Sequence, residues 1–199
     1  MKAFAYYRLP GQDEFTFVEQ TEGELHIVSS ASSLGEGAGF VVAPFAVSGN
    51  TPAVVIRPDR VEHGRTHPLP DTAGGGGARP YGGGTDEERM RYGRDFRKFH
   101  EQLLSGKFSK IVLSRRSDIT ADVRETPETL FFRACGMFPH AFVALVSTPL
   151  TGTWLAATPE ILLERHGESW RTMALAGTMP AQAYADEPVW SLKDIEEQR

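Results

Sequence analysis

Short apolar runs near the start of the chain are separated by clusters of Gly, Pro and Ser. Runs of this kind, rich in β-branched and aromatic residues, favour strands, and the clusters favour tight turns. The sequence therefore predicts strands within residues 1–60, at 3–8, 15–18, 25–28 and 53–56. The following stretch is irregular and rich in Gly and Pro, so a surface loop is predicted over 61–84. A phosphate-binding glycine loop is disfavoured, because no Gly-Lys-Ser/Thr sequence follows.

Helical periodicity begins at residue 85. Thr85 and Glu88 have the spacing of a capping box, and Gly106 is placed to end the helix in the left-handed conformation. Between them, apolar residues recur at helical spacing at Met90, Phe96, Phe99 and Leu103. Thr126-Pro127 predicts the start of a second helix, since proline is favoured at the first helical position.

The rest of the chain alternates between apolar and polar residues. A strand is predicted over 108–115, with Lys110, Val112 and Ser114 on one face. An antiparallel meander is expected at 142–147, 153–157, 161–165 and 170–176, and a last helix from about 188. Many strands with a few helices, not in strict alternation, predict an α+β fold of antiparallel sheets with flanking helices.

Composition limits the classes of partner. The chain has 199 residues and a net charge of −5, with no Lys/Arg-rich run, so no nucleic-acid partner is expected. No stretch approaches the roughly 18 apolar residues of a membrane span, and no signal peptide is evident at the N-terminus. A single cysteine, Cys135, fits a reducing compartment and is interpreted as a core residue. A cytoplasmic location without a membrane partner is the expectation.

Two motifs carry candidate acid–base residues. Lys110 lies in the otherwise apolar segment Lys110-Ile-Val-Leu-Ser-Arg115, where it is either an edge-strand lysine reaching water or a general base. Glu160 ends Ala157-Thr-Pro-Glu160, where the proline restricts the approach of its backbone. A glutamate here is either a turn carboxylate or, when partly desolvated, a general acid.

Two further motifs carry candidate ligand-binding residues. In Ala174-Leu-Ala-Gly-Thr178, Gly177 would let a ligand approach the backbone and the Thr178 hydroxyl could bond to it; a simple turn is the alternative. Asp194 and Glu197 are three residues apart and share a helix face. Such carboxylates suit Mg²⁺, although a solvated helix face explains them equally.

The four motifs in this order resemble those of the chorismate-binding enzymes, and among these the isochorismate synthases. The resemblance covers roughly residues 85–199. It implies the fold of anthranilate synthase component I, chorismate as substrate and Mg²⁺ as cofactor. It also implies that Lys110 activates a water to attack C2 of chorismate and that Glu160 protonates the departing C4 hydroxyl. The ligand-contacting turn would be formed by Ala176, Gly177 and Thr178, and the metal ligands would include Glu197, with Asp194 nearby.

The same motifs separate the related activities. Aminodeoxychorismate synthases have a lysine at the place of Ala176, and anthranilate synthases generally lack a lysine at the place of Lys110. Salicylate synthases share Lys110 and Glu160 and remain the alternative. The resemblance does not decide between menaquinone and siderophore synthesis, with menaquinone slightly favoured.

Relatives of this kind run further at the C-terminus. Residues 1–199 are therefore expected to be the N-terminal portion of a single chorismate-binding domain, with 85–199 bearing the motifs. Such a chain would be inactive alone, a non-catalytic fragment, or a partner of the C-terminal portion that carries the remaining metal carboxylates.

Overall fold

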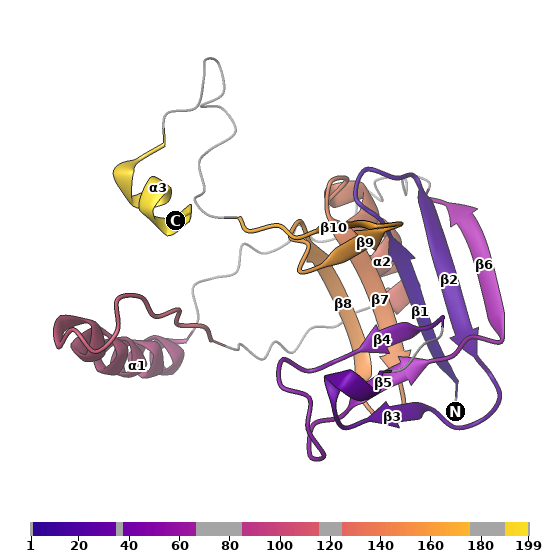
Figure 1. Cartoon of the computed structure of the whole chain (residues 1–199), viewed down its shortest axis with the longest axis horizontal. Helices are drawn as coiled ribbons and strands as arrows, with labels where there is room; N and C mark the ends of the chain where they lie inside the picture. The colour runs from indigo at the N-terminus through magenta and orange to yellow at the C-terminus, as the bar shows by residue number, and fades with distance from the viewer. Residues whose placement is uncertain (1, 35–37, 67–84, 116–124, 176–189, 199) are drawn as a thin grey trace. The chain divides into compact units, whose positions relative to one another are not determined.

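The computed structural model describes residues 2–34, 38–66, 85–115, 125–175 and 190–198 (Figure 1). The chain divides into two compact units. Unit 1 comprises Met1–Leu69 and Glu125–Arg199, and unit 2 comprises Pro70–Arg124. Unit 1 contains the sheets and unit 2 contains a long helix, so the α+β class predicted from the sequence is confirmed.

The main element of unit 1 is a five-stranded antiparallel sheet (Figure 1). Its order is β6-β2-β1-β7-β8. The central strand β1 pairs with β2, its neighbour in sequence, and with β7 from the far end of the chain, where Phe4 lies opposite Ser147. The strand bounds are Ala3–Arg8 for β1, Glu14–Gln20 for β2, Arg60–Arg65 for β6, Phe142–Thr148 for β7 and Gly152–Thr158 for β8.

One face of this sheet packs against a smaller sheet. Strands β3 (His26–Val28), β5 (Ala53–Ile56) and β4 (Phe40–Val42) form it in that order. A short 3₁₀ turn, Ala31–Ser33, follows β3. The shared core consists of five buried residues, of which Ile56 comes from the smaller sheet: Ala3, Ala5, Val18, Ile56 and Val146.

The opposite face packs against helix α2, Pro127–Met137. Phe131, Ala134 and Cys135 of α2 meet Val143 and Leu145 of β7 in a second buried cluster. Because side chains alternate along a strand, Val143 and Leu145 face the helix while Val146 faces the smaller sheet. The two-residue period of the apolar pattern therefore builds a three-layer core.

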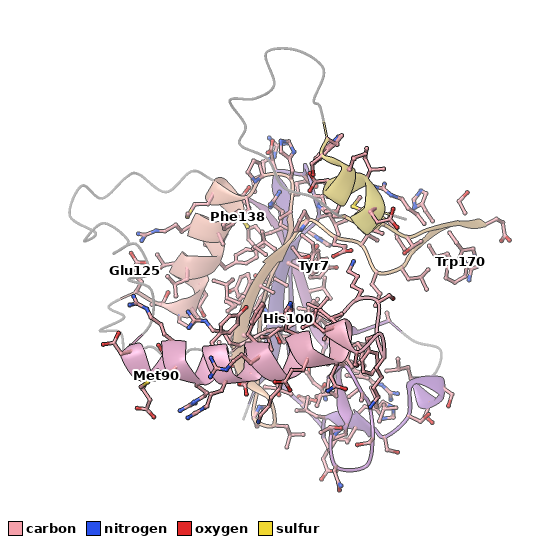
Figure 2. All side chains as sticks on the ribbon, turned by 90° about the vertical axis from the view of Figure 1, so that its left-hand side faces the viewer. Tyr7, Met90, His100, Glu125, Phe138 and Trp170 are labelled. Atoms are coloured by element: carbon pink, nitrogen blue, oxygen red, sulfur yellow. The ribbon has the colours of Figure 1, made fainter. Side chains whose placement is uncertain are left out.

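The helix boundaries follow the sequence signals. Helix α1 spans Asp86–Leu104 and begins with the predicted capping box between Thr85 and Glu88. Gly106 has a φ of 71°, which confirms the left-handed position just past the helix. Thr126 caps α2, and Pro127 occupies its first turn. None of the α1 side chains is buried, and those of Met90 and His100 project from it in Figure 2.

Two strand predictions are wrong. The predicted loop 61–84 begins with a regular strand, because β6 pairs with β2 from Arg60 to Arg65; the remainder, 67–84, lies outside the described residues. Conversely, residues 108–115 form no strand. Among the described residues no strand pairs with this segment, and an extended chain becomes a strand only when another strand accepts its hydrogen bonds.

The predicted meander ends after two strands. Strands β7 and β8 pair as expected, but β9 (Glu164–His166) and β10 (Ser169–Arg171) form a separate two-stranded sheet. Strand β4 was not predicted. The last helix, α3, spans Leu192–Gln198 and starts later than residue 188, because Ser191 caps it.

Candidate active site

Glu160 lies just past the end of β8, where Thr158 and Pro159 lead into it. The Glu160 backbone N–H donates to the Thr158 hydroxyl at 3.2 Å, which fixes the turn after the strand. The exposed side chain of Glu160 reaches across to another segment, where its Oε1 accepts a hydrogen bond from the backbone N–H of Leu175 at 3.4 Å. A carboxylate from one motif is therefore tied to the backbone of another.

Two further hydrogen bonds hold these segments side by side. The Met173 N–H donates to the Ile161 carbonyl at 2.9 Å, and the Thr172 hydroxyl donates to the Leu162 carbonyl at 2.8 Å. These contacts continue the pairing of β9 and β10 away from their turn. The motif that ends at Glu160 and the motif that begins at Ala174 are thus neighbours in space, because the chain between them forms the β9–β10 hairpin.

The three residues predicted to contact the ligand come directly after Leu175 in the chain. Ala176, Gly177 and Thr178 lie outside the described residues, so their role stays a prediction. The described chain runs up to Leu175, which is the residue that bonds to Glu160.

Lys110 belongs to unit 2 and Glu160 to unit 1, and each is described within its own unit. The Lys110 side chain is exposed and lines a cavity of about 630 Å³. Phe99, Phe108 and Ile111 give this cavity apolar walls, and Lys98 adds a second ammonium group. Glu101 and Gln102 of α1 complete the lining. The site combines apolar surface with cationic groups, which suits a small ring that carries a negative charge.

The predicted metal ligands lie on α3. The Asp194 carboxylate accepts hydrogen bonds from the backbone N–H and the hydroxyl of Ser191, at 3.2 and 2.5 Å. In return the Ser191 hydroxyl accepts from the Asp194 N–H, which completes a capping box. The Glu197 side chain lies outside the described part of the structure.

A magnesium site needs about six oxygen ligands, several of them waters. Among the described residues no group of three His, Cys, Asp or Glu side chains comes together. Asp194, which already takes part in the capping box of α3, is the one described carboxylate of the predicted pair. The described residues alone therefore do not make a magnesium site.

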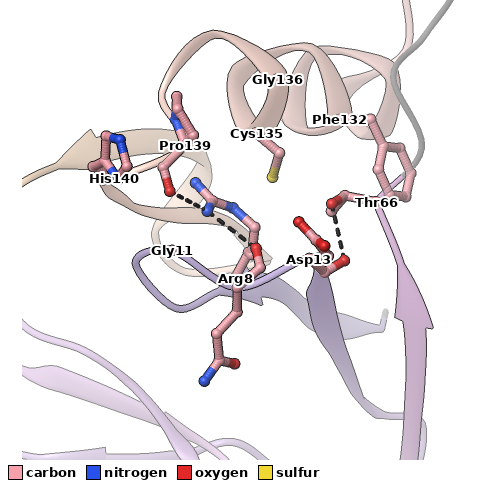
Figure 3. A pocket seen from close by; sticks show the side chains of 10 residues that line it. Arg8, Gly11, Asp13, Thr66, Phe132, Cys135, Gly136, Pro139 and His140 are labelled. Atoms are coloured by element: carbon pink, nitrogen blue, oxygen red, sulfur yellow. Dashed lines mark hydrogen bonds between the residues drawn. The ribbon is translucent and has the colours of Figure 1, made fainter.

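Sequence reasoning missed a buried arginine at the end of β1. Arg8 is 2% exposed and donates to five backbone carbonyl oxygens; Figure 3 shows its bond to Pro139. The shortest of these bonds run to Phe138 at 2.6 Å and Pro139 at 2.7 Å, in the turn between α2 and β7. Period-two alternation places Arg8 on the face of β1 that carries Phe4 and Tyr6. A charged residue on that apolar face was the available signal.

Arg8 also lines a cavity of about 450 Å³ that includes Asp13, Cys135 and His140 (Figure 3). Burial raises the pKa of the Cys135 thiol, and the nearby Arg8 guanidinium offsets only part of this effect. The thiol therefore stays protonated at neutral pH, which agrees with the interpretation of Cys135 as a core residue rather than a nucleophile.

Comparison with known families identifies the chain. The family model described as "Chorismate binding enzyme" matches residues 83–192, which is more than half of the chain. The protein belongs to the chorismate-binding enzymes, a family that acts on chorismate. Comparison with curated proteins and with solved structures gives no significant match. None of the helices in the described ranges is long and apolar enough to cross a membrane.

Proposed function

We propose that this chain carries the proton-transfer residues of an isochorismate synthase, with Lys110 as general base and Glu160 as general acid. Membership of the chorismate-binding enzymes supports chorismate as the substrate. Lys110 lies within the matched residues 83–192, and so does Glu160. The anthranilate synthase component I-like fold and a cytoplasmic location are part of the same proposal.

The reaction exchanges one hydroxyl position for another. As the base, Lys110 takes a proton from a water molecule, whose oxygen forms a bond to C2 of chorismate. The ring double bonds shift, the C4–O bond breaks, and Glu160, as the acid, gives a proton to the departing hydroxyl. One water enters and one leaves, so substrate and product are isomers. A base and an acid acting on different carbons avoid a free hydroxide leaving group.

The observation that carries the proposal is the hydrogen bond between Leu175 and Glu160. It holds the proposed acid beside the segment that leads into Ala176, Gly177 and Thr178, where the substrate is expected to bind. A general acid must lie within hydrogen-bonding reach of the leaving group. A carboxyl group anchored beside the segment that leads into these residues supports this role for Glu160.

The cavity beside Lys110 supports the role of this residue as the base. Its apolar walls, which include Phe99 and Phe108, suit the ring of chorismate, and Lys98 offers a cationic group to a substrate carboxylate beside the carboxylate of Glu101. The protein has a net charge of −5, so local cations are needed to attract a dianion.

Mg²⁺ is a further part of the proposal, with Glu197 and Asp194 as ligands, and it rests on the resemblance. When bound, such an ion would offset the charge of the substrate carboxylates. Direct titration of the chain with Mg²⁺, with and without the Glu197→Gln substitution, tests this part separately from turnover.

The test is an assay with chorismate and Mg²⁺ in which the products are separated by chromatography. Any isochorismate formation by the wild type should fall at least about 100-fold in Lys110→Ala and in Glu160→Gln. Lys107→Ala and Glu168→Gln are matched controls, because both residues are exposed neighbours of the same charge, and they should retain activity. Equal activity in all four variants would contradict the proposal.

Two other outcomes of this assay would each support a different alternative. Salicylate and pyruvate in place of isochorismate would identify the salicylate synthase alternative, which uses the same two residues. No turnover of chorismate by the wild type would support the non-catalytic alternative for this chain.

A further inference from the structure

The backbone of Glu160 is tied to the five-stranded sheet by the side chain of Thr158. Thr158 is the last residue of β8, where it pairs with Phe142 of β7. Its hydroxyl accepts a hydrogen bond from the Glu160 N–H at 3.2 Å. Pro159 lies between the two and has no N–H, so Glu160 carries the first backbone donor after the strand. The paired strand therefore fixes Thr158, and Thr158 holds the residue that follows the turn.

The carboxylate of Glu160 is held less firmly than its backbone. The side chain is exposed, and its Oε1 lies 3.4 Å from the backbone nitrogen of Leu175. This distance exceeds the range of about 2.7–3.2 Å that such bonds usually have. An exposed glutamate also has several rotamers available, and fixing one of them costs entropy. A small displacement of the Glu160 backbone would therefore break the contact with Leu175.

Threonine combines two properties that other residues supply separately. Its branched Cβ favours a strand, as in the last position of β8. Its hydroxyl accepts a hydrogen bond from a nearby backbone N–H. Valine has the branch without the acceptor, and serine has the acceptor without the branch. Substitutions of Thr158 can therefore separate the hydrogen bond to Glu160 from the stability of the strand.

We propose that Thr158 is a positioning residue for Glu160. Its hydroxyl holds the Glu160 backbone where the carboxyl group stays within reach of the Leu175 N–H, beside the segment that leads into Ala176. Thr158 itself neither contacts the substrate nor transfers a proton. Its consequence for catalysis rests on the proposed function, whereas the two hydrogen bonds belong to unit 1 and involve no residue of unit 2.

The first test measures amide hydrogen exchange by NMR in the full 199-residue chain. In Thr158→Val the Glu160 amide should exchange at least about fivefold faster, because its acceptor is lost. The Leu175 amide should also exchange faster, and Thr158→Ser should restore both amides. An effect on Leu175 is the readout that separates positioning of the carboxyl group from a local role in the turn. The proposal is overturned if the Leu175 amide is unchanged in Thr158→Val, or if serine fails to restore it.

Thr153→Val is the matched control, since Thr153 lies on the same strand but shares its hydrogen bond with the Ser147 hydroxyl. This variant should leave the Glu160 and Leu175 amides as they are in the wild type. An equal effect of Thr153→Val would overturn the proposal, because it would show a general loosening of β8.

The second test uses the chorismate assay. Thr158→Val should lower kcat at least about fivefold and leave KM unchanged, and Thr158→Ser should recover the activity. Unchanged turnover in Thr158→Val beside an inactive Glu160→Gln would overturn the positioning role and leave the proposed function intact. If the wild type gives no turnover, the proposed function fails for this chain, and the exchange rates of Glu160 and Leu175 alone decide whether Thr158 holds Glu160.

Discussion

Arg8 shows how one side chain can join distant parts of the chain. Its guanidinium connects the end of β1 to the turn after α2, more than a hundred residues later, through carbonyl oxygens of Phe138, Pro139 and Ala141. Buried carbonyl groups that lose such a donor incur a desolvation penalty. The arginine is therefore a structural residue on the core face of β1.

Replacing this arginine should destabilise unit 1. We expect Arg8→Met to lower the free energy of unfolding by about 3 kcal/mol, because several buried carbonyls lose their donor at once. Urea unfolding followed by tryptophan fluorescence measures the change. Arg57→Met, at an exposed arginine of the same unit, should change it by less than about 0.5 kcal/mol. Equal effects of the two substitutions would rule out the structural role of Arg8.

Asp59 makes stability depend on pH. Its carboxylate accepts from the backbone N–H groups of Glu22 at 2.9 Å and Thr21 at 2.8 Å, and also from the Thr21 hydroxyl. These hydrogen bonds lower the pKa of Asp59 below its ordinary 3.8. A lowered pKa stabilises the fold above the unfolded-state value, and this stabilisation disappears as the pH falls through the folded-state value.

The variant Asp59→Asn removes this dependence. We expect the wild type to be the more stable of the two at pH 6, and the difference to shrink as the pH is lowered below about 4. Free energies of unfolding measured between pH 2 and pH 6 test this. A difference that does not change with pH would show that the Asp59 charge is not involved.

At the scale of elements, the two capped helices differ in what their caps stabilise. Thr85 caps α1, which has no buried side chain, and Thr126 caps α2, which buries Phe131 against the sheet. A cap contributes about 1 kcal/mol in either place. For α1 this energy acts on a helix of unit 2, whereas for α2 it acts on the folding of unit 1.

Removing each cap should separate these effects. We expect Thr126→Ala to lower the free energy of unfolding of unit 1 by about 1 kcal/mol. Thr85→Ala should instead reduce the helical circular dichroism signal and leave the tryptophan-detected unfolding of unit 1 unchanged. Circular dichroism and fluorescence recorded on the same samples distinguish the two. A shift of both signals in Thr85→Ala would mean that α1 folds cooperatively with the sheet.

The helices and strands also show which features the residue pattern predicts and which it does not. The caps at Thr85 and Thr126 were predicted correctly, because each involves residues three or four positions apart. Strand β6 was predicted as a loop, and the segment 108–115 was predicted as a strand that the structure does not contain. Charged residues conceal the strand character of β6, and the alternation of 108–115 does not reveal whether a partner strand is present. Local hydrogen bonds can be inferred from sequence more readily than pairing.

At the scale of the whole molecule, stability is unevenly distributed between the units. Buried clusters surround β1 and β7 in unit 1, whereas the side chains of α1 in unit 2 are all at least partly exposed. Isolated helices of this length are marginally stable in water. Backbone amides open most easily where few apolar contacts are buried.

Hydrogen exchange should reveal this difference. We expect amides of α1, Asp86–Leu104, to exchange at least about 100-fold faster than those of β1 and β7. Mass spectrometry of peptides from the exchanged chain provides the measurement. Equal protection of α1 and β7 would show that both units unfold together.

The sequence by itself determined the helix caps, most of the strands in 1–60, the α+β class and the order of motifs that marks the family. These features depend on residues close together in the chain or on residue identity alone. Only the tertiary structure decided that Arg8 joins β1 to the turn after α2, that Glu160 bonds to Leu175, and that β1 lies between β2 and β7 in the described sheet. Each of these depends on which distant segments meet, and the periodicity of a strand does not specify its partner.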